Sequence, residues 1–286
     1  MSVYRPATLL RTAADRLTAA GLPSGMADAR ILLAHVLGVE TTALATTSSV
    51  DPTAAEKFRV LVQRRASWEP VQHLTGVAYF RHEKLHVGPG VFIPRPETEG
   101  LVQLVIDWLA DEGIADPVVV DLGAGSGAIA CALARETDAV VHAIEASEDA
   151  LVYARRNLPD SVDLRAGDWN DAFPDLDGAA DVVVSNPPYV PTRLAARSTP
   201  LPRDVAGRDP DEALFAGPDG LSCVREIVPV AARLLRPGGL LAVEHDETHG
   251  ASAPAVVRKD ARFHQIDDHR DLTDRPRYLT ARRITS

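Results

Sequence analysis

Five short apolar runs alternate with helical patterns between residues 117 and 244, and this alternation restricts the possible folds most strongly. The runs are rich in β-branched residues and are expected to be strands at 117–122, 139–145, 162–165, 181–185 and 239–244, with weaker candidates near Phe263 and Tyr278. Strands that alternate with helices form a doubly wound, mostly parallel sheet. The sequence therefore predicts an α/β fold for this part of the chain.

The front of the chain has a different pattern, typical of a small all-α bundle. Apolar residues recur at helical spacing from 9 to 17, and Asp28 opens a second helical run that Gly38 ends. A third helix is expected after Thr53, which has the spacing of a capping box with Glu56. The charged residues of this third helix are expected on a solvated face: Lys57, Arg59, Arg64 and Arg65.

Glycine and proline mark the boundary between these two parts. Extended segments at 75–93 are interrupted by Gly76 and by the Gly-Pro-Gly sequence at 88–90, which suits a hairpin. We therefore expect a helical bundle at 1–75, a hairpin linker at 76–93 and an α/β domain at 94–286.

Composition narrows the classes of partner. The net charge is −10, and beyond residue 80 there are 22 Lys and Arg against 34 Asp and Glu. Such acidity disfavours direct DNA binding, because nonspecific affinity for DNA comes mainly from neutralised phosphates. The sequence contains neither a signal-peptide pattern nor a membrane-spanning run, so a cytoplasmic protein is expected. The two cysteines, Cys131 and Cys223, fall in apolar helical patterns and are expected to be buried thiols.

A glycine-rich segment follows the first predicted strand and enters a helix. Asp121 precedes Gly123, Gly125 and Gly127, and such glycines let backbone N–H groups approach a ligand closely. Gly123 and Gly125, with Ala128, also satisfy the dinucleotide-binding spacing. However, Asp121 could meet a cationic ligand group, and no later strand ends in residues suited to hydride transfer. Both observations favour a ligand other than a dinucleotide.

Acidic residues follow the next two predicted strands. Glu145 could accept hydrogen bonds from ribose hydroxyls, although it could instead cap a helix beside Ser147. Asp168 and its neighbour Trp169 could supply an acceptor for an adenine amine and an apolar wall for the ring. A glycine loop, a ribose acid and an adenine acid in this order describe an adenosyl ligand without phosphates, S-adenosylmethionine, whose product is S-adenosylhomocysteine.

The fourth predicted strand ends in Asn186, Pro187, Pro188 and Tyr189. Two prolines stiffen the backbone and remove two N–H donors, which leaves carbonyl groups free beside a side-chain amide and an aromatic ring. This corner could hold a planar –NH2 group, with Asn186 also near the cofactor. The simpler alternative is a turn that ends the strand, since Asn-Pro is common in turns.

Five segments carry a resemblance to a known family. They are 70–76 (PVQHLTG), 92–99 (FIPRPETE), 121–127 (DLGAGSG), 185–189 (SNPPY), and 213–214 with 217–221 (AL and GPDGL). With them the chain resembles class I S-adenosylmethionine-dependent methyltransferases and, more closely, the release factor glutamine methyltransferases of the PrmC/HemK family. Three departures affect the substrate rim, at Asp246, at Asp274 and at Ala206-Gly207.

The resemblance implies a seven-stranded, Rossmann-like methyltransferase domain preceded by a helical domain that recognises the substrate. It implies methylation of the glutamine amide nitrogen in the Gly-Gly-Gln motif of class I peptide chain release factors. Asn186, Pro187 and Tyr189 would be catalytic, and Pro188 and Arg95 would contact substrate. A ribosomal protein glutamine or, less favoured, a DNA adenine remains an alternative acceptor. A monomer is expected.

Two further features have less specific interpretations. The irregular segment 191–220 is expected to be a loop that faces the substrate. His245 and His249 have the spacing of metal ligands on a helix, but residues 242–244 are expected to end a strand whose end borders the site. No metal is expected.

Overall fold

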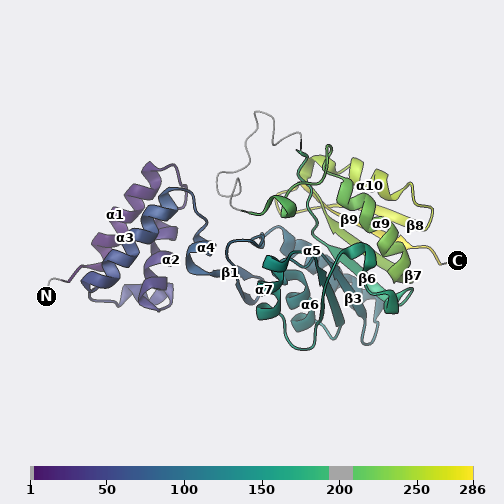
Figure 1. Ribbon diagram of the computed structural model, residues 1–286, viewed down its shortest axis with the longest axis horizontal. Helices are drawn as coiled ribbons and strands as arrows, with labels where there is room; N and C mark the ends of the chain where they lie inside the picture. The colour runs from purple at the N-terminus through teal and green to yellow at the C-terminus, as the bar shows by residue number, and fades with distance from the viewer. Residues whose placement is uncertain (1–2, 193–208, 286) are drawn as a thin grey trace. The chain divides into compact units, whose positions relative to one another are not determined.

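The computed structural model describes residues 3–192 and 209–285 (Figure 1). These form two compact units, one of residues 3–77 and one of residues 78–192 with 209–285. The middle of the expected substrate-facing loop, including Ala206 and Gly207, lies outside the described residues. Over the described parts, no helix is both long and apolar enough to cross a membrane.

The first unit is a helical bundle. Its elements are α1 (Pro6–Ala19), α2 (Gly25–Leu37), the 3-10 helix η1 (Thr41–Ala45), α3 (Pro52–Ala66) and α4 (Val71–Thr75). Apolar side chains from α1, α2 and α3 form its core, in which Leu17, Leu32, Leu33 and Phe58 are fully buried. The helical periodicity of the sequence therefore predicted this unit correctly.

The start of α3 differs from the expected capping box. Asp51 is the N-cap, and its Oδ1 accepts hydrogen bonds from the backbone N–H groups of Thr53 and Ala54 at 2.9 and 3.0 Å. Pro52 occupies the first helical turn, where its missing N–H has no intrahelical partner to lose. The predicted cap at Thr53 was wrong because Asp51 combines a better capping side chain with a proline that favours the first turn.

Arg65 is buried, contrary to the solvated face expected for it. It lies seven residues after Phe58 and three after Val62, which places it on the apolar stripe of α3. Its Nε donates to Asp28 Oδ2 at 2.7 Å, and both side chains are less than a tenth exposed. Asp28 is itself in the first turn of α2, which begins at Gly25 rather than at Asp28.

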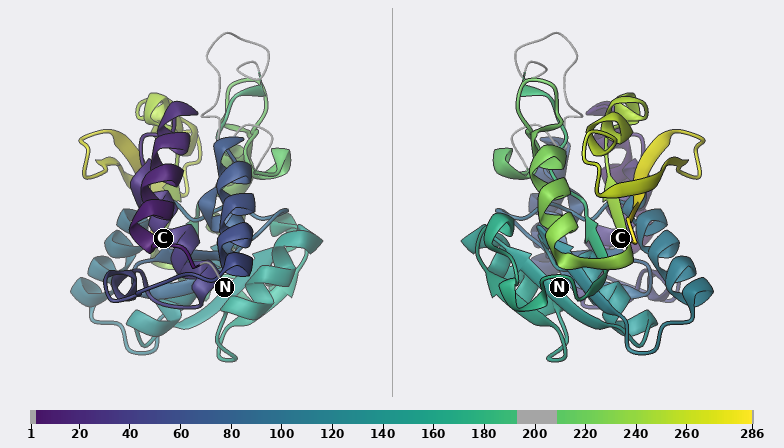
Figure 2. Two further views of the ribbon diagram at one scale, coloured as in Figure 1. Left: turned by 90° about the vertical axis from the view of Figure 1, so that its left-hand side faces the viewer. Right: turned by 90° about the vertical axis from the view of Figure 1, so that its right-hand side faces the viewer.

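The second unit contains a seven-stranded sheet, as predicted. A hairpin of β1 (Val77–Phe80) and β2 (Glu83–His86) precedes it in the chain. The strands of the sheet are β3 (Val118–Leu122), β4 (Val140–Glu145), β5 (Asp163–Ala166), β6 (Ala180–Ser185), β7 (Leu235–Glu244), β8 (Phe263–Arg270) and β9 (Pro276–Arg283). The two weaker candidates are thus the strands β8 and β9, which form one edge of the sheet (Figure 2, yellow).

The strand order is β5-β4-β3-β6-β7-β9-β8. Neighbours from β5 to β7 are parallel, whereas β9 is antiparallel to both β7 and β8. The chain moves outward from β3 to β5 and then returns to place β6 on the other side of β3. Ligands of open α/β sheets bind beyond the carboxyl ends of the strands at such a reversal.

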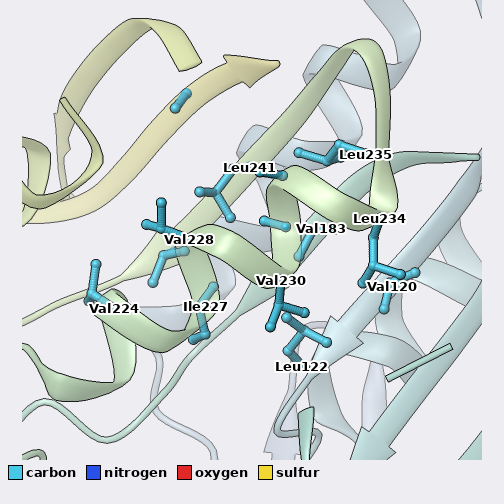
Figure 3. Packing of buried hydrophobic residues seen from close by; sticks show 14 of the residues in the cluster. Val120, Leu122, Val183, Val224, Ile227, Val228, Val230, Leu234, Leu235 and Leu241 are labelled. Atoms are coloured by element: carbon cyan, nitrogen blue, oxygen red, sulfur yellow. The ribbon is translucent and has the colours of Figure 1, made fainter. Parts of the chain in front are cut away.

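Helices cover both faces of the sheet. Alternate residues of β3 face opposite ways: Val119 packs with α5 (Thr98–Glu112) and α6 (Ala128–Glu136), whereas Val120 packs with α9 (Ser222–Leu234) and α10 (Ser252–Val257). Figure 3 shows side chains of α9 and of the strands filling the space between helix and sheet. Cys131 and Cys223 are buried free thiols, as predicted. A further helix, α7 (Glu148–Asn157), follows β4.

Candidate active site

A cavity of about 580 Å³ lies at the carboxyl ends of β3, β4 and β6, within the second unit. Its volume falls in the range of small-molecule sites, roughly 300–1,000 Å³. The sequence-predicted residues that line it are Gly123, Gly125, Glu145, Trp169, Asn186, Pro187, Pro188 and Tyr189. The reversal of strand order therefore brings the glycine loop after β3 and the Asn-Pro-Pro-Tyr corner after β6 to one cavity.

The glycine loop is held by β4. The backbone N–H groups of Gly123 and Ala124 both donate to the Ile144 carbonyl at 3.0 Å, and the N–H of Gly125 donates to Glu145 Oε2 at 2.7 Å. Gly123 has φ +76°, and a Cβ there would lie 3.3 Å from Cζ3 of Trp169. Glycine at this position thus allows both the left-handed backbone and the close approach of the indole ring.

Glu145 keeps hydrogen-bonding capacity for a ligand. Its Oε1 accepts from the N–H of Ser147 at 2.7 Å, so the helix-start contact considered as an alternative also exists. Ser147 itself caps α7 through its side chain. A carboxylate offers about four lone-pair positions, and two are used here. The carboxylate can therefore support the loop and still accept hydrogen bonds from a ligand in the cavity.

Four sequence-predicted site residues do not line the cavity. Gly127 is the N-cap of α6, and Asp168 caps a 3-10 helix by accepting from the backbone N–H and side-chain amide of Asn170 at 2.8 Å. Arg95 forms an ion pair with Asp209 at 2.5 Å. The fourth is Asp121, which lies beneath the loop.

Asp121 is fully buried at the end of β3. Its Oδ2 accepts from the N–H of Ala130 at 3.2 Å, and its Oδ1 has no hydrogen-bond partner among the residues that the structure describes. Burial raises the pKa of this carboxyl to about 7, because the apolar surroundings disfavour the charged form. A cationic group bound nearby would favour the charged form of this buried carboxyl group, which has an unused oxygen next to the loop.

The other end of the cavity is polar and includes residues that sequence reasoning did not assign to the site. Asn186 Nδ2 donates to Thr98 Oγ1 at 3.0 Å, and the Tyr189 hydroxyl donates to Glu244 Oε1 at 3.4 Å. Thr98 lines the cavity at the start of α5. It belongs to the 92–99 segment that carried the resemblance, which is the only sequence signal that could have found it.

Apolar residues of the hairpin region complete the lining. Val91, Phe92 and Pro94 contribute one wall, and Ile129 and Leu214 contribute others. Sequence reasoning had treated 76–93 as a linker, and apolar residues in a connecting segment give no local signal that they face a ligand. With these residues the lining of the cavity combines apolar walls with a few oriented polar groups, as is typical of small-molecule sites.

Two of the residues that depart from the pattern of the resembled family, Asp246 and Asp274, lie in turns. Asp246 begins a 3-10 helix and accepts from the N–H of Thr248 at 2.9 Å, with an ordinary φ of −64°. Asp274 has φ +62° in the turn between β8 and β9, a left-handed conformation that favours glycine. Nearby, both ring nitrogens of His245 are within hydrogen-bond distance, 2.8 Å from Asp268 Oδ1 and 2.9 Å from the Asp246 carbonyl oxygen.

Replacing Gly123 with alanine is expected to weaken binding of the expected S-adenosylmethionine about tenfold. An L-residue relieves its left-handed strain of roughly 1–2 kcal/mol by shifting the backbone, and here that shift, together with the Cβ that pushes against Trp169, moves the loop that faces the cavity. Isothermal titration calorimetry measures the dissociation constant. The matched control is Gly113→Ala, since Gly113 has φ +60° but a Cβ there meets nothing within 4 Å and lies outside the cavity lining. Equal binding by both variants would contradict a ligand seated on this loop.

Comparison with known proteins places the chain among methyltransferases. A model of the PrmC N-terminal domain matches residues 8–76, and a model of the methyltransferase small domain matches residues 84–198. The chain is 48% identical to the release factor glutamine methyltransferase of Streptomyces coelicolor over 95% of each chain. It is 46% identical to the protein of the same name from Mycolicibacterium smegmatis over 97% of each chain.

A relative with another name is also similar. This is the 4-amino-L-phenylalanine/4-methylamino-L-phenylalanine methyltransferase of Streptomyces pristinaespiralis, which is 41% identical over 90% of this chain and 88% of its own. The similarity in all three cases extends across both compact units. Overall identity therefore does not separate a protein acceptor from a small aromatic amine.

Proposed function

The chain belongs to the family of release factor glutamine methyltransferases, which use S-adenosylmethionine, and on that premise we propose which atom it methylates. The proposed acceptor is the side-chain amide nitrogen, N5, of the glutamine in the Gly-Gly-Gln motif of class I peptide chain release factors. The observation that carries the proposal is that the Asn186–Tyr189 corner lines the same cavity as the glycine loop.

The cofactor end of the cavity fits S-adenosylmethionine by its donors, acceptors and shape. Glu145 has acceptor positions left for ribose hydroxyls, and the space beside Gly123 and Trp169 is one that a side chain at Gly123 would fill. Asp121, Gly125, Gly127 and Asp168 support this end through the loop and the turns around it. When bound, S-adenosylmethionine supplies an electrophilic methyl group on a sulfonium.

The acceptor end must orient a weak nucleophile. An amide nitrogen is weak because its lone pair is delocalised into the carbonyl, and no side chain simply deprotonates it at neutral pH. We propose that Asn186 Oδ1 and the Pro187 carbonyl accept its two protons, while Pro188 and the ring of Tyr189 bound the amide plane. Fixed acceptors of this kind both aim the nitrogen and stabilise the positive charge that grows on it.

Roles outside the cavity complete the proposal. The helical unit, residues 3–77, would recognise the release factor, and Arg95 would contact it near the entrance. A monomer acting in the cytoplasm, where release factors work, is the simplest arrangement, without direct binding to DNA.

Three other acceptors are tested against this one. A glutamine of a ribosomal protein would use the same corner, and so would an aromatic amine such as that named for the Streptomyces pristinaespiralis relative. An adenine amine in DNA would need extrusion from the duplex and a grip on the phosphates. The acidity of the chain disfavours that grip.

The test is transfer of labelled methyl groups from S-adenosylmethionine by the purified protein. Class I release factor, the same factor with Gln→Ala in its Gly-Gly-Gln motif, a ribosomal protein fraction, 4-amino-L-phenylalanine and duplex DNA are assayed in parallel. We expect label on the release factor and none on the Gln→Ala version. Label that persists on the altered factor, or that appears mainly on another acceptor, would overturn the proposal.

A further inference from the structure

Glu244 is a buried carboxyl group beside the acceptor end of the cavity, and the proposed chemistry leaves it without a role. It is the last residue of β7 and only 1% exposed. Its Oε1 receives the Tyr189 hydroxyl, and its Oε2 has no hydrogen-bond partner within the described ranges. Burying a carboxyl group costs free energy unless it is well bonded. The presence of a buried carboxyl group beside the acceptor end, despite that cost, therefore points to a role in the reaction.

The contacts of Glu244 lead directly to Asn186. Thr98 lies beside the Glu244 carboxyl group and favours its charged form, and Thr98 Oγ1 accepts a hydrogen bond from Asn186 Nδ2 at 3.0 Å. Thr98 is itself buried. Three side chains from α5, from the residues after β6 and from the end of β7 thus lie next to one another, with a hydrogen bond between Asn186 and Thr98 and with Glu244 beside Thr98.

The direction of these bonds follows from the chemistry of the groups. An ionised carboxylate only accepts hydrogen bonds, and it attracts the proton of a neighbouring hydroxyl. The Thr98 O–H is therefore directed toward Glu244, whose Oε2 is left to accept it. The lone pairs of Thr98 Oγ1 then accept from the nitrogen of the Asn186 amide and not from its oxygen. The amide oxygen, Oδ1, is left as the end available to the cavity that Asn186 and Thr98 both line.

We propose that Thr98 and Glu244 are positioning residues that fix the Asn186 amide with Oδ1 toward the acceptor, so that it accepts a hydrogen bond from the acceptor –NH2 group. The proposal rests on the proposed function in that it requires an acceptor with N–H groups. It also explains why the Asn186 side-chain amide, whose oxygen and nitrogen have nearly the same shape, is held in one orientation.

Protonation of Glu244 would remove the constraint. A neutral carboxyl group can donate to Thr98 Oγ1, which frees the hydroxyl to donate to Oδ1 and turn the Asn186 amide. Burial, the largest influence, raises the pKa of Glu244 to about 7. The charged and titratable groups around Glu244 are Glu97, Tyr189, Arg277 and Tyr278, with His245 and Asp246 next in the chain.

The sign of the pH dependence follows from that pKa. Above it Glu244 is ionised and the amide is held, whereas below it the carboxyl group is protonated and the amide can turn. The neighbouring Thr98 and Tyr189 hydroxyls and the charge of Arg277 oppose the effect of burial, and the charge of Glu97 reinforces it. Turnover should therefore fall as the pH is lowered through about 7.

Kinetics of four variants test the proposal. Thr98→Val keeps the side-chain shape without the hydroxyl and should lower kcat about tenfold, with the S-adenosylmethionine dissociation constant within about twofold of wild type. Thr98→Ser restores the hydroxyl and should recover most of kcat. Glu244→Gln should lose the decline of kcat in acid. Thr280→Val is the matched control, since it removes another buried threonine hydroxyl, one that contacts His269 at 2.7 Å away from the cavity.

A second readout needs no acceptor. The side-chain NH2 signals of Asn186, assigned by their loss in Asn186→Ala, should shift in NMR spectra with a midpoint near pH 7 in the wild type and not in Glu244→Gln. Two results would overturn the positioning role of Thr98 and Glu244. One is Asn186 signals that do not titrate in the wild type, and the other is a Thr98→Val enzyme with wild-type kcat. The kinetic assays use whichever acceptor the wild type methylates. Label on an acceptor other than the release factor would therefore overturn the proposed function without overturning the positioning role of Thr98 and Glu244.

Discussion

Replacing Asn186 with alanine is expected to lower kcat for methyl transfer by a factor of about 10², since loss of one oriented polar group at a reacting centre typically costs roughly 10²–10³ in rate. The variant removes the acceptor for one proton of the substrate amide. Single-turnover assays with labelled S-adenosylmethionine measure the rate of the chemical step separately from product release.

Binding measurements separate this effect from a general loss of structure. S-adenosylmethionine should bind to Asn186→Ala within about twofold of wild type by calorimetry, because the contacts expected for the cofactor come mainly from β3, β4 and the residues after β5. Unchanged turnover would exclude Asn186 from the chemistry. Equal losses of cofactor affinity and rate would assign it to cofactor binding instead.

Replacing Asp28 with alanine should destabilise the helical unit by about 3–5 kcal/mol, because it leaves the Arg65 guanidinium buried without its anionic partner. The matched control is Glu56→Ala, which removes the partner of Arg59 on the same α3 helix. That pair is exposed, with side-chain exposures of 68% and 44%, and exposed pairs contribute about 0–1 kcal/mol.

Native-state hydrogen exchange of amides in α2 and α3 measures this loss within the full chain, since it reports the opening of the helical unit directly. The double variant Asp28→Leu with Arg65→Met should recover much of the stability, because apolar residues of similar size remove the need to bury charge. A cost for Asp28→Ala as small as that for Glu56→Ala would show that the buried pair contributes little.

Local patterns predicted the elements of this fold, and long-range contacts explain the errors. The strands and helices follow from periodicity within a dozen residues, so the sheet and the bundle were both predicted. Arg65 was placed on the solvated face because its partner is 37 residues away in sequence. The cap of α3 was predicted at Thr53 from its spacing to Glu56, whereas the structure has it two residues earlier, at Asp51.

For the candidate site, the positions of residues at strand ends were predictable from the sequence, whereas long-range contacts and side-chain directions were not. Gly123, Glu145 and Asn186 each follow a predicted strand, so topology alone was enough to bring them to one edge. The link between Asn186 and Thr98 spans 88 residues and depends on how α5 begins beside the sheet. Asp121 and Asp168 were expected to face the ligand because sequence gives the position of a carboxylate along the chain but not the direction of its side chain.

The central reversal of strand order divides the cavity into two halves with separate origins. The proposed cofactor contacts lie after β3, β4 and β5, whereas the proposed acceptor contacts lie after β6 and at the start of α5. Substitutions on the second side can reshape the acceptor pocket without touching the first. A lineage with this architecture can therefore exchange one nitrogen acceptor for another while retaining its methyl donor, and acceptor specificity is the property most open to engineering.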